Sequence, residues 1–198
     1  TVAKNDRKVI QKLAGKIALS LKSAKNPLII SGISCGDMAI VHAALNIVYS
    51  LLSNGSNVML SMVLPECNSM GLSLLPGKSF EDAFGLVENK EIDTLVILEN
   101  DLYRRASEDA INELFKKSGR IIVLDHLSNK TTQNADILIP AATFAESEGT
   151  MVNNEGRAQR YYKSIDSKNQ IKESWCWIAD IIKVRDTDHS VSWNRLDD

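Results

Sequence analysis

The stretch Ala135–Tyr162, ADILIPAATFAESEGTMVNNEGRAQRYY, carries the strongest structural signals in this chain. It begins with a short apolar run, Asp136–Pro140, which predicts a buried strand that stops at proline, because proline has no N–H to donate to a neighbouring strand. Small, polar and flexible residues then follow at unusual density, and Gly149 and Gly156 bracket them. Glycine permits backbone conformations that other residues rarely adopt. We therefore expect tight turns that hold the backbone close to another group, rather than an ordinary surface loop.

On the N-terminal side of this stretch, apolar runs and amphipathic segments alternate. The apolar runs predict strands at Leu28–Ile30, Val58–Val63, Thr94–Leu98 and Ile121–Leu124. The amphipathic patterns predict helices at Asp6–Leu21, after Asp37, at Phe80–Asn89 with Ser79 as N-cap, after Ser107, and around Trp175, Ile178, Ala179 and Ile182. This alternation predicts an α/β fold, a doubly wound, mostly parallel, Rossmann-like sheet of about five strands with helices on both faces.

The length of the chain fits one main domain. A chain of 198 residues can bury one good core. We expect a Rossmann-like α/β domain over residues 1–165, and a C-terminal helix and tail over residues 166–198 that pack on it or on parts of a longer protein. The sequence does not begin with Met, which suggests a fragment of something longer.

Composition excludes several classes of function. With 44% hydrophobic and 24% charged residues, the chain has the composition of a soluble globular protein. A net charge of −2 gives no electrostatic basis for binding nucleic acid. No apolar run approaches the length that a membrane span requires, so we expect no direct membrane insertion.

The cysteines and histidines do not predict a metal site. The three cysteines, Cys35, Cys67 and Cys176, are widely spaced, which fits a reducing cytoplasm without a disulfide framework. An iron–sulfur cubane is held by four thiolates, so this chain alone cannot supply one. The three histidines share no metal-ligand spacing: His42, His126 and His189.

One short motif suggests a hydrolase. Gly32–Gly36 matches the G-x-S-x-G nucleophile elbow and lies between a predicted strand and a predicted helix, which would make Ser34 the nucleophile. Only one helix precedes it, and the acid and base of a triad would have to come from Asp125 with its neighbour His126 or with His189. A glycine-rich turn is the simpler interpretation, and a serine hydrolase is a remote alternative.

The polar loop itself contains two further candidate groups. Glu146 and Glu148 could act as paired acid and base, but loop carboxylates are more often solvated or hydrogen-bonded to nearby amides. Arg157 could use its planar guanidinium to clamp the loop from within, with Glu155 as a neighbour. We favour this structural role for Arg157 over substrate binding.

The segments A-D-I-L-I-P-A-A-T-F-A-E-S-E-G-T and V-N-N-E-G-R-A-Q-R, in that order, resemble the molybdopterin-dependent oxidoreductases. Within that superfamily they are most similar to the G subunits of bacterial NADH:quinone oxidoreductase, respiratory complex I. The lead-in Thr131–Asp136 and the segments Ser174–Trp177 and Val191–Asp197 also resemble that family. The resemblance implies a Rossmann-like layer of the formate dehydrogenase and DMSO reductase type, beside a pterin cleft.

For a member of the G-subunit group, the resemblance implies a structural, cofactor-free domain that supports electron transfer from NADH to quinone. The [4Fe-4S] and [2Fe-2S] clusters would lie in an N-terminal part of the same polypeptide, and that part and other peripheral-arm subunits would be the partners. The complex would lie on the cytoplasmic side of the bacterial inner membrane. The implied remnants of a pterin cleft are Thr150, Asn153, Glu155, Gly156 and Arg157.

One departure from the family pattern concerns the cofactor. Catalytic members carry Asn-Pro at the end of the strand that corresponds to Thr94–Leu98, whereas this chain continues with Glu99-Asn100-Asp101. Negative charge beside a pyrophosphate is electrostatically unfavourable. We therefore expect no molybdopterin here, and a part of an active molybdopterin-dependent oxidoreductase is the alternative.

Overall fold

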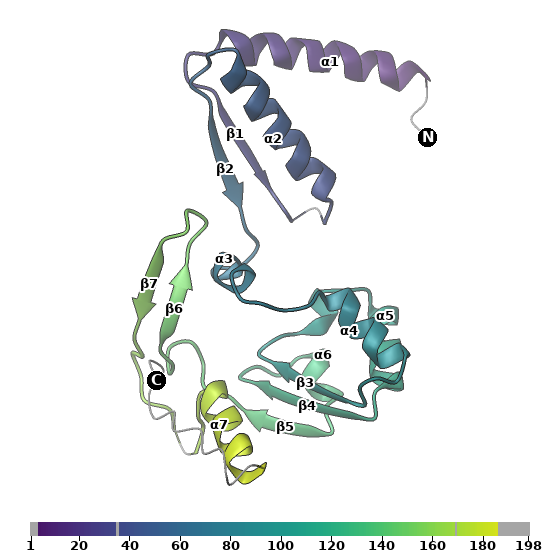
Figure 1. The fold of residues 1–198 in the computed structure, drawn as a ribbon, viewed down its shortest axis with the longest axis vertical. Coiled ribbons are helices and arrows are strands. Elements are labelled where there is room, and N and C mark those ends of the chain that lie inside the picture. Colours follow the sequence, from purple (N-terminus) through teal and green to yellow (C-terminus); the bar gives the residue numbers. More distant parts are fainter. Residues whose placement is uncertain (1–3, 35, 169, 186–198) are drawn as a thin grey trace. The chain divides into compact units, whose positions relative to one another are not determined.

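The computed structural model describes residues 4–34, 36–168 and 170–185, and the chain divides into two compact units. Unit 1 comprises Thr1–Leu74 and Val152–Ala158, and unit 2 comprises Leu75–Met151 and Gln159–Asp198. Both units contain a parallel sheet with helices, so the α/β class expected from the sequence is correct (Figure 1). The assignment of 1–165 as one domain stays a proposal.

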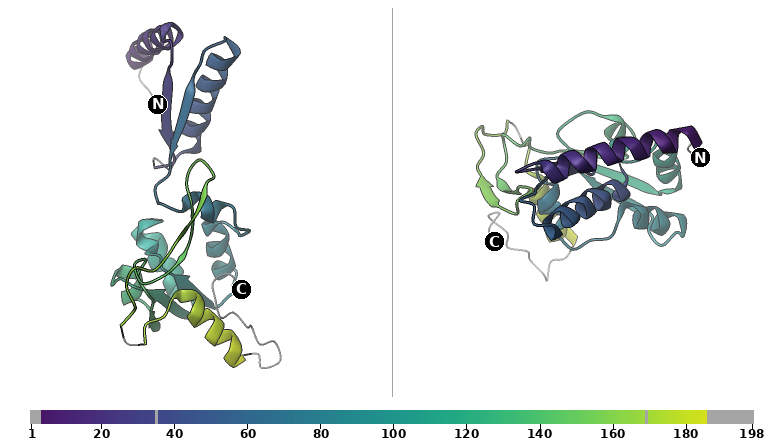
Figure 2. Two further views of the ribbon diagram at one scale, coloured as in Figure 1. Left: turned by 90° about the vertical axis from the view of Figure 1, so that its left-hand side faces the viewer. Right: turned by 90° about the horizontal axis from the view of Figure 1, so that it is seen from above.

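Unit 1 is built around two parallel strands. Its elements are α1 (Lys4–Ser23), β1 (Leu28–Gly32), α2 (Met38–Ser53), β2 (Met59–Val63) and α3 (Ser69–Ser73). The strands pair in register from Leu28 opposite Met59 to Gly32 opposite Val63. The connecting helix α2 packs against β1 and runs alongside the strand pair (Figure 2). Asp37 caps α2 as predicted, because its carboxylate accepts the N–H of Ala39 at 2.8 Å.

Unit 2 contains a three-stranded parallel sheet in the order β3-β4-β5. Its elements are α4 (Phe80–Glu88), β3 (Thr94–Leu98), η1 (Leu102–Arg104), α5 (Glu108–Lys117), β4 (Arg120–Asp125), α6 (Lys130–Gln133), β5 (Ile137–Pro140) and α7 (Ser174–Arg185). Ser79 and Ser107 cap α4 and α5, as the sequence predicted. The short helix α6, which has a capping box of its own, was not predicted.

The core of unit 2 lies between one face of this sheet and the helices α4 and α5. Ile97, Ile121 and Val123 alternate along β3 and β4, so they point to the same face, and they pack with Val87 of α4 and Ile111 of α5. Ile111 and Val123 are fully buried. On β3 the opposite face is partly bare, since Val96 is 56% and Leu98 44% exposed.

The polar segment of the opening stretch forms a hairpin, β6 (Gly149–Val152) and β7 (Ala158–Tyr161). The sequence predicted tight turns here but not the two strands. Gly149 is required by packing, because a Cβ at this position would lie 2.7 Å from the ring of Tyr161. The tip of the hairpin, Val152–Ala158, belongs to unit 1.

The expected single sheet of five strands is not confirmed. Five parallel strands are present where the sequence predicted them, but they form separate sheets of two and three. The connection between β2 and β3 contains Pro65, Pro76 and Gly77, and it forms the short α3 before α4 begins. An apolar run predicts a strand but not its neighbour, because pairing depends on the path of the connecting chain.

Candidate functional site

The carboxyl ends of β3 and β4 carry acidic side chains at one edge of the unit 2 sheet, the edge at which α/β proteins usually bind ligands. We call Glu99, Asp101 and Asp125 the strand-end acids. Glu99 follows β3 with a left-handed backbone, φ 48°, and its N–H donates to the carbonyl of Leu124 at 2.7 Å. Its carboxylate accepts a hydrogen bond from Ser174 Oγ, at the start of α7, at 2.5 Å. The end of β3 is thereby joined to the C-terminal helix.

Asp125 ends β4 and is only 7% exposed. Its Oδ1 accepts the backbone N–H groups of His126 at 2.7 Å and of Leu127 at 3.1 Å. Its Oδ2 accepts from the side-chain amide of Asn129 at 2.8 Å. Consecutive N–H groups in a turn form a typical anion-binding nest. In this chain the anion in that nest is the chain's own carboxylate.

Asp101 links the loop after β3 to α6 through a hydrogen bond. Its Oδ1 accepts from Thr131 Oγ1 at 2.8 Å and from the N–H of Tyr103 at 3.3 Å. Thr131 Oγ1, which is fully buried, in turn accepts the N–H of Leu102 at 2.9 Å. This network explains why a polar threonine is tolerated inside the core, since its hydroxyl both donates and accepts.

The strand-end acids do not fit the pyrophosphate of a pterin dinucleotide. The two backbone N–H groups after β4 already donate to Asp125, so they are not available to a phosphate oxygen. Glu99 and Asp101 add negative charge at the end of β3, where a phosphate would be repelled. The departure from Asn-Pro noted in the sequence thus lies at the same edge as two N–H groups that already donate to a carboxylate of the chain.

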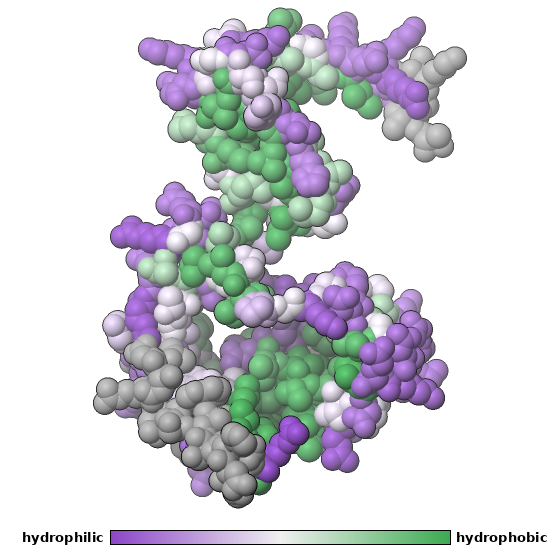
Figure 3. Space-filling model, in the orientation of Figure 1, coloured by the Kyte–Doolittle hydropathy of each residue, from purple (hydrophilic) through white to green (hydrophobic). Residues whose placement is uncertain are grey.

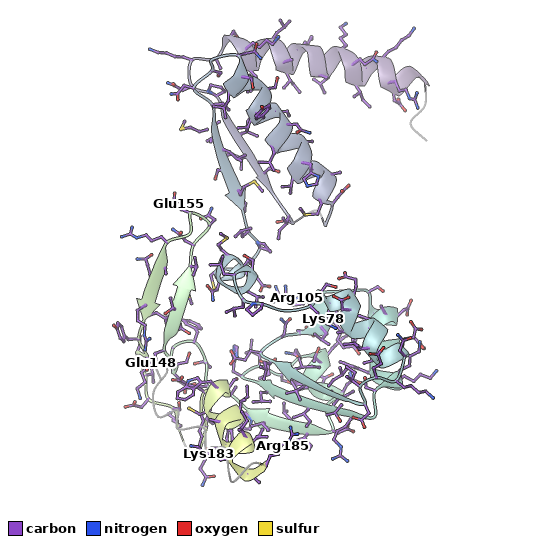
Figure 4. All side chains as sticks on the ribbon, in the orientation of Figure 1. Lys78, Arg105, Glu148, Glu155, Lys183 and Arg185 are labelled. Atoms are coloured by element: carbon purple, nitrogen blue, oxygen red, sulfur yellow. The ribbon has the colours of Figure 1, made fainter. Side chains whose placement is uncertain are left out.

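The structure brings four of the five predicted cleft residues together at the hairpin tip. Asn153 Oδ1 accepts the N–H groups of Glu155 at 3.1 Å and of Arg157 at 2.9 Å. Gly156 has φ 80°, the left-handed conformation that favours glycine. Glu155 lies at the exposed tip (Figure 4). Thr150 is separate from this turn, in β6, where it is exposed.

The predicted clamp by the side chain of Arg157 is wrong. Arg157 is exposed, and among the described residues its guanidinium forms no hydrogen bond or ion pair. The side chain that locks the turn is Asn153, because an amide oxygen at this distance can accept two backbone N–H groups at once. The Asn-Asn-Glu-Gly sequence is itself a turn signal, so this role could have been predicted.

The hairpin tip also contacts the end of β2 within unit 1. Asn154 Nδ2 donates to the carbonyl of Met62 at 2.8 Å, and the N–H of Val152 donates to Asn68 Oδ1 at 2.8 Å. An open pocket of about 320 Å³ lies beside these contacts, lined by Val63–Cys67 and Val152–Asn154. Its lining is mostly apolar, with Glu66 as its one charged residue, so it does not assemble a catalytic set.

The other candidate groups have structural surroundings. Glu146 accepts the N–H of Thr143 at 3.0 Å and its hydroxyl at 2.9 Å, and these hydrogen bonds lower the pKa of the Glu146 carboxyl. Glu148 lies 3.5 Å from a guanidinium nitrogen of Arg160. Glu146 therefore bonds to a nearby amide, as expected, whereas Glu148 lies beside a guanidinium instead.

The hydrolase hypothesis gains no support. Ser34 lies in an exposed turn, and within the described ranges no hydrogen bond joins it to a histidine. The carboxylate of Asp125 already accepts three hydrogen bonds, and His126 Nδ1 lies 3.5 Å from it. Cys35 and His189 lie outside the described residues.

The tryptophans of α7 pack locally. Trp177 Nε1 donates to the carbonyl of Pro140 at 3.0 Å, and Lys172 lies over its ring at 4.9 Å. Trp175 donates to the carboxylate of Glu173. Both side chains are half-buried. Trp193, in the C-terminal tail, lies outside the described residues.

Within the described ranges, no three His, Cys, Asp or Glu side chains gather in a way that could hold a metal ion. Cys67 is exposed, and burial raises the pKa of the half-buried Cys176. None of the described helices is both long enough and apolar enough to cross a membrane.

Comparison with known proteins identifies the family. The family model described as molybdopterin oxidoreductase matches residues 1–184. The chain belongs to the molybdopterin oxidoreductase family. The resemblance that the sequence suggested is thereby confirmed, and a fold of this family is consistent with the parallel sheets and helices of both units.

Curated relatives within this family are named as the G subunit of NADH-quinone oxidoreductase. The chain is 39% identical over 186 residues to the protein of Escherichia coli strain K12, a match that covers 91% of this chain and 20% of that protein. It is 42% identical over 190 residues to the protein of Buchnera aphidicola, covering 93% of this chain and 21% of the relative. The chain therefore spans about a fifth of the length of the curated relatives.

Proposed function

We propose that this chain is a structural, cofactor-free part of the G subunit of an NADH-quinone oxidoreductase, respiratory complex I. It supports the iron–sulfur part of that polypeptide while electrons pass from NADH towards quinone. The support for this assignment is the match to several relatives of that name over nearly all of this chain. The support for the lack of a cofactor is the set of strand-end acids.

Asp125 is the single observation on which the cofactor-free role depends. A carboxylate that accepts two consecutive backbone N–H groups and a side-chain amide stabilises the turn after β4 without any ligand. To bind a phosphate there, the chain would have to displace a buried charge from its hydrogen bonds, which is costly. The carboxyl end of β4 is thus stable without a bound ligand.

The clusters and the partners belong to this proposal as well. The [4Fe-4S] and [2Fe-2S] clusters lie in another part of the same polypeptide, since three cysteines cannot hold a cubane. The partners are that cluster-bearing part and other peripheral-arm subunits, on the cytoplasmic side of the bacterial inner membrane. Thr150, Asn153, Glu155, Gly156 and Arg157 are remnants of a pterin cleft that now form or flank a hairpin turn.

The test is the molybdenum and pterin content of a full-length G subunit that carries this sequence. The protein should be purified from cells that make molybdopterin, beside an active molybdopterin oxidoreductase prepared in the same way as the positive control. We expect both molybdenum and pterin to be at background in the full-length protein and stoichiometric in the control. Stoichiometric cofactor in the full-length protein would instead establish the alternative, a part of an active molybdopterin-dependent oxidoreductase.

A further inference from the structure

We draw no further inference here: the strongest candidate, the open apolar groove between α1 and α2 of unit 1, which Ile17, Leu21 and Ile47 line beside the apolar side chains gathered over α2 (Figure 3), carries no proposal because nothing in the structure shows what covers it.

Discussion

Asp125 shows how a single carboxylate can make an edge of a sheet unsuitable for an anionic ligand. It occupies the position at the end of β4 where many α/β proteins place backbone donors against an anion. Here those donors are satisfied by a residue of the chain itself. The buried charge is tolerated because each of its oxygens has a hydrogen-bond partner.

Replacement of this residue should be costly. We expect Asp125→Ala to lower the free energy of unfolding by about 1–3 kcal/mol, since two backbone N–H groups and one amide lose their acceptor. Urea denaturation followed by circular dichroism measures this loss. Glu113→Ala is the matched control, because that carboxylate only forms a surface pair with Lys116 at 3.8 Å. An equally small effect of both substitutions would show that Asp125 does not organise the turn.

At the scale of elements, the hairpin β6–β7 shows how a short amide side chain, rather than the guanidinium of Arg157, holds a turn. The turn depends on the side chain of Asn153 and on the left-handed backbone of Gly156. Open space surrounds the Cα of Gly156, so a methyl group there would meet no neighbour within 4 Å. The cost of a substitution at this glycine therefore comes from the backbone alone.

This reasoning predicts the behaviour of Gly156→Ala. A left-handed conformation costs an alanine about 1–2 kcal/mol. The open form of the hairpin should therefore be about 5- to 30-fold more populated, and trypsin should cleave after Arg157 faster by the same factor. Gly77→Ala is the control, since Gly77 has open space and no left-handed φ. Equal cleavage rates in the two variants would contradict the assigned role of Gly156.

At the scale of the whole molecule, the two units differ in how completely each buries its apolar side chains. The largest fully buried side chains, Val87, Ile111, Val123, Leu124 and Thr131, all belong to unit 2. In unit 1 the best-buried apolar residues, Val41, Ala44 and Leu51, each keep 7% of their surface exposed. Apolar burial is the main favourable term in folding, so unit 1 should be the less stable of the two.

Native-state hydrogen exchange of the 198-residue chain tests this difference. We expect the amides of β1 and β2 to exchange at least about tenfold faster than those of β3 and β4, because local opening is easier where fewer apolar contacts must be broken. The amides of α5, which buries Ile111 and Leu114, serve as the reference for global unfolding. Equal protection of both sheets would contradict the prediction that unit 1 is the less stable unit.

The sequence by itself determined the family, the alternation of helices and strands, and most helix starts. Each of these depends on residues close together in the chain, such as Ser79 and Ser107 at their caps or the apolar run Thr94–Leu98. The family likeness depends on an ordered set of residues in one stretch, and the match over residues 1–184 confirmed it. Local patterns are readable because their energetics are local.

Only the tertiary structure decided which strands pair and which side chains satisfy which donors. The five parallel strands pair as β1–β2 and as β3–β4–β5, and no strand pattern encodes which strands become neighbours. The choice of Asn153 over Arg157 in the turn, and of Asp125 as the anion after β4, depended on geometry within about 3 Å. Such distances follow from the packed backbone, so composition and spacing could not supply them.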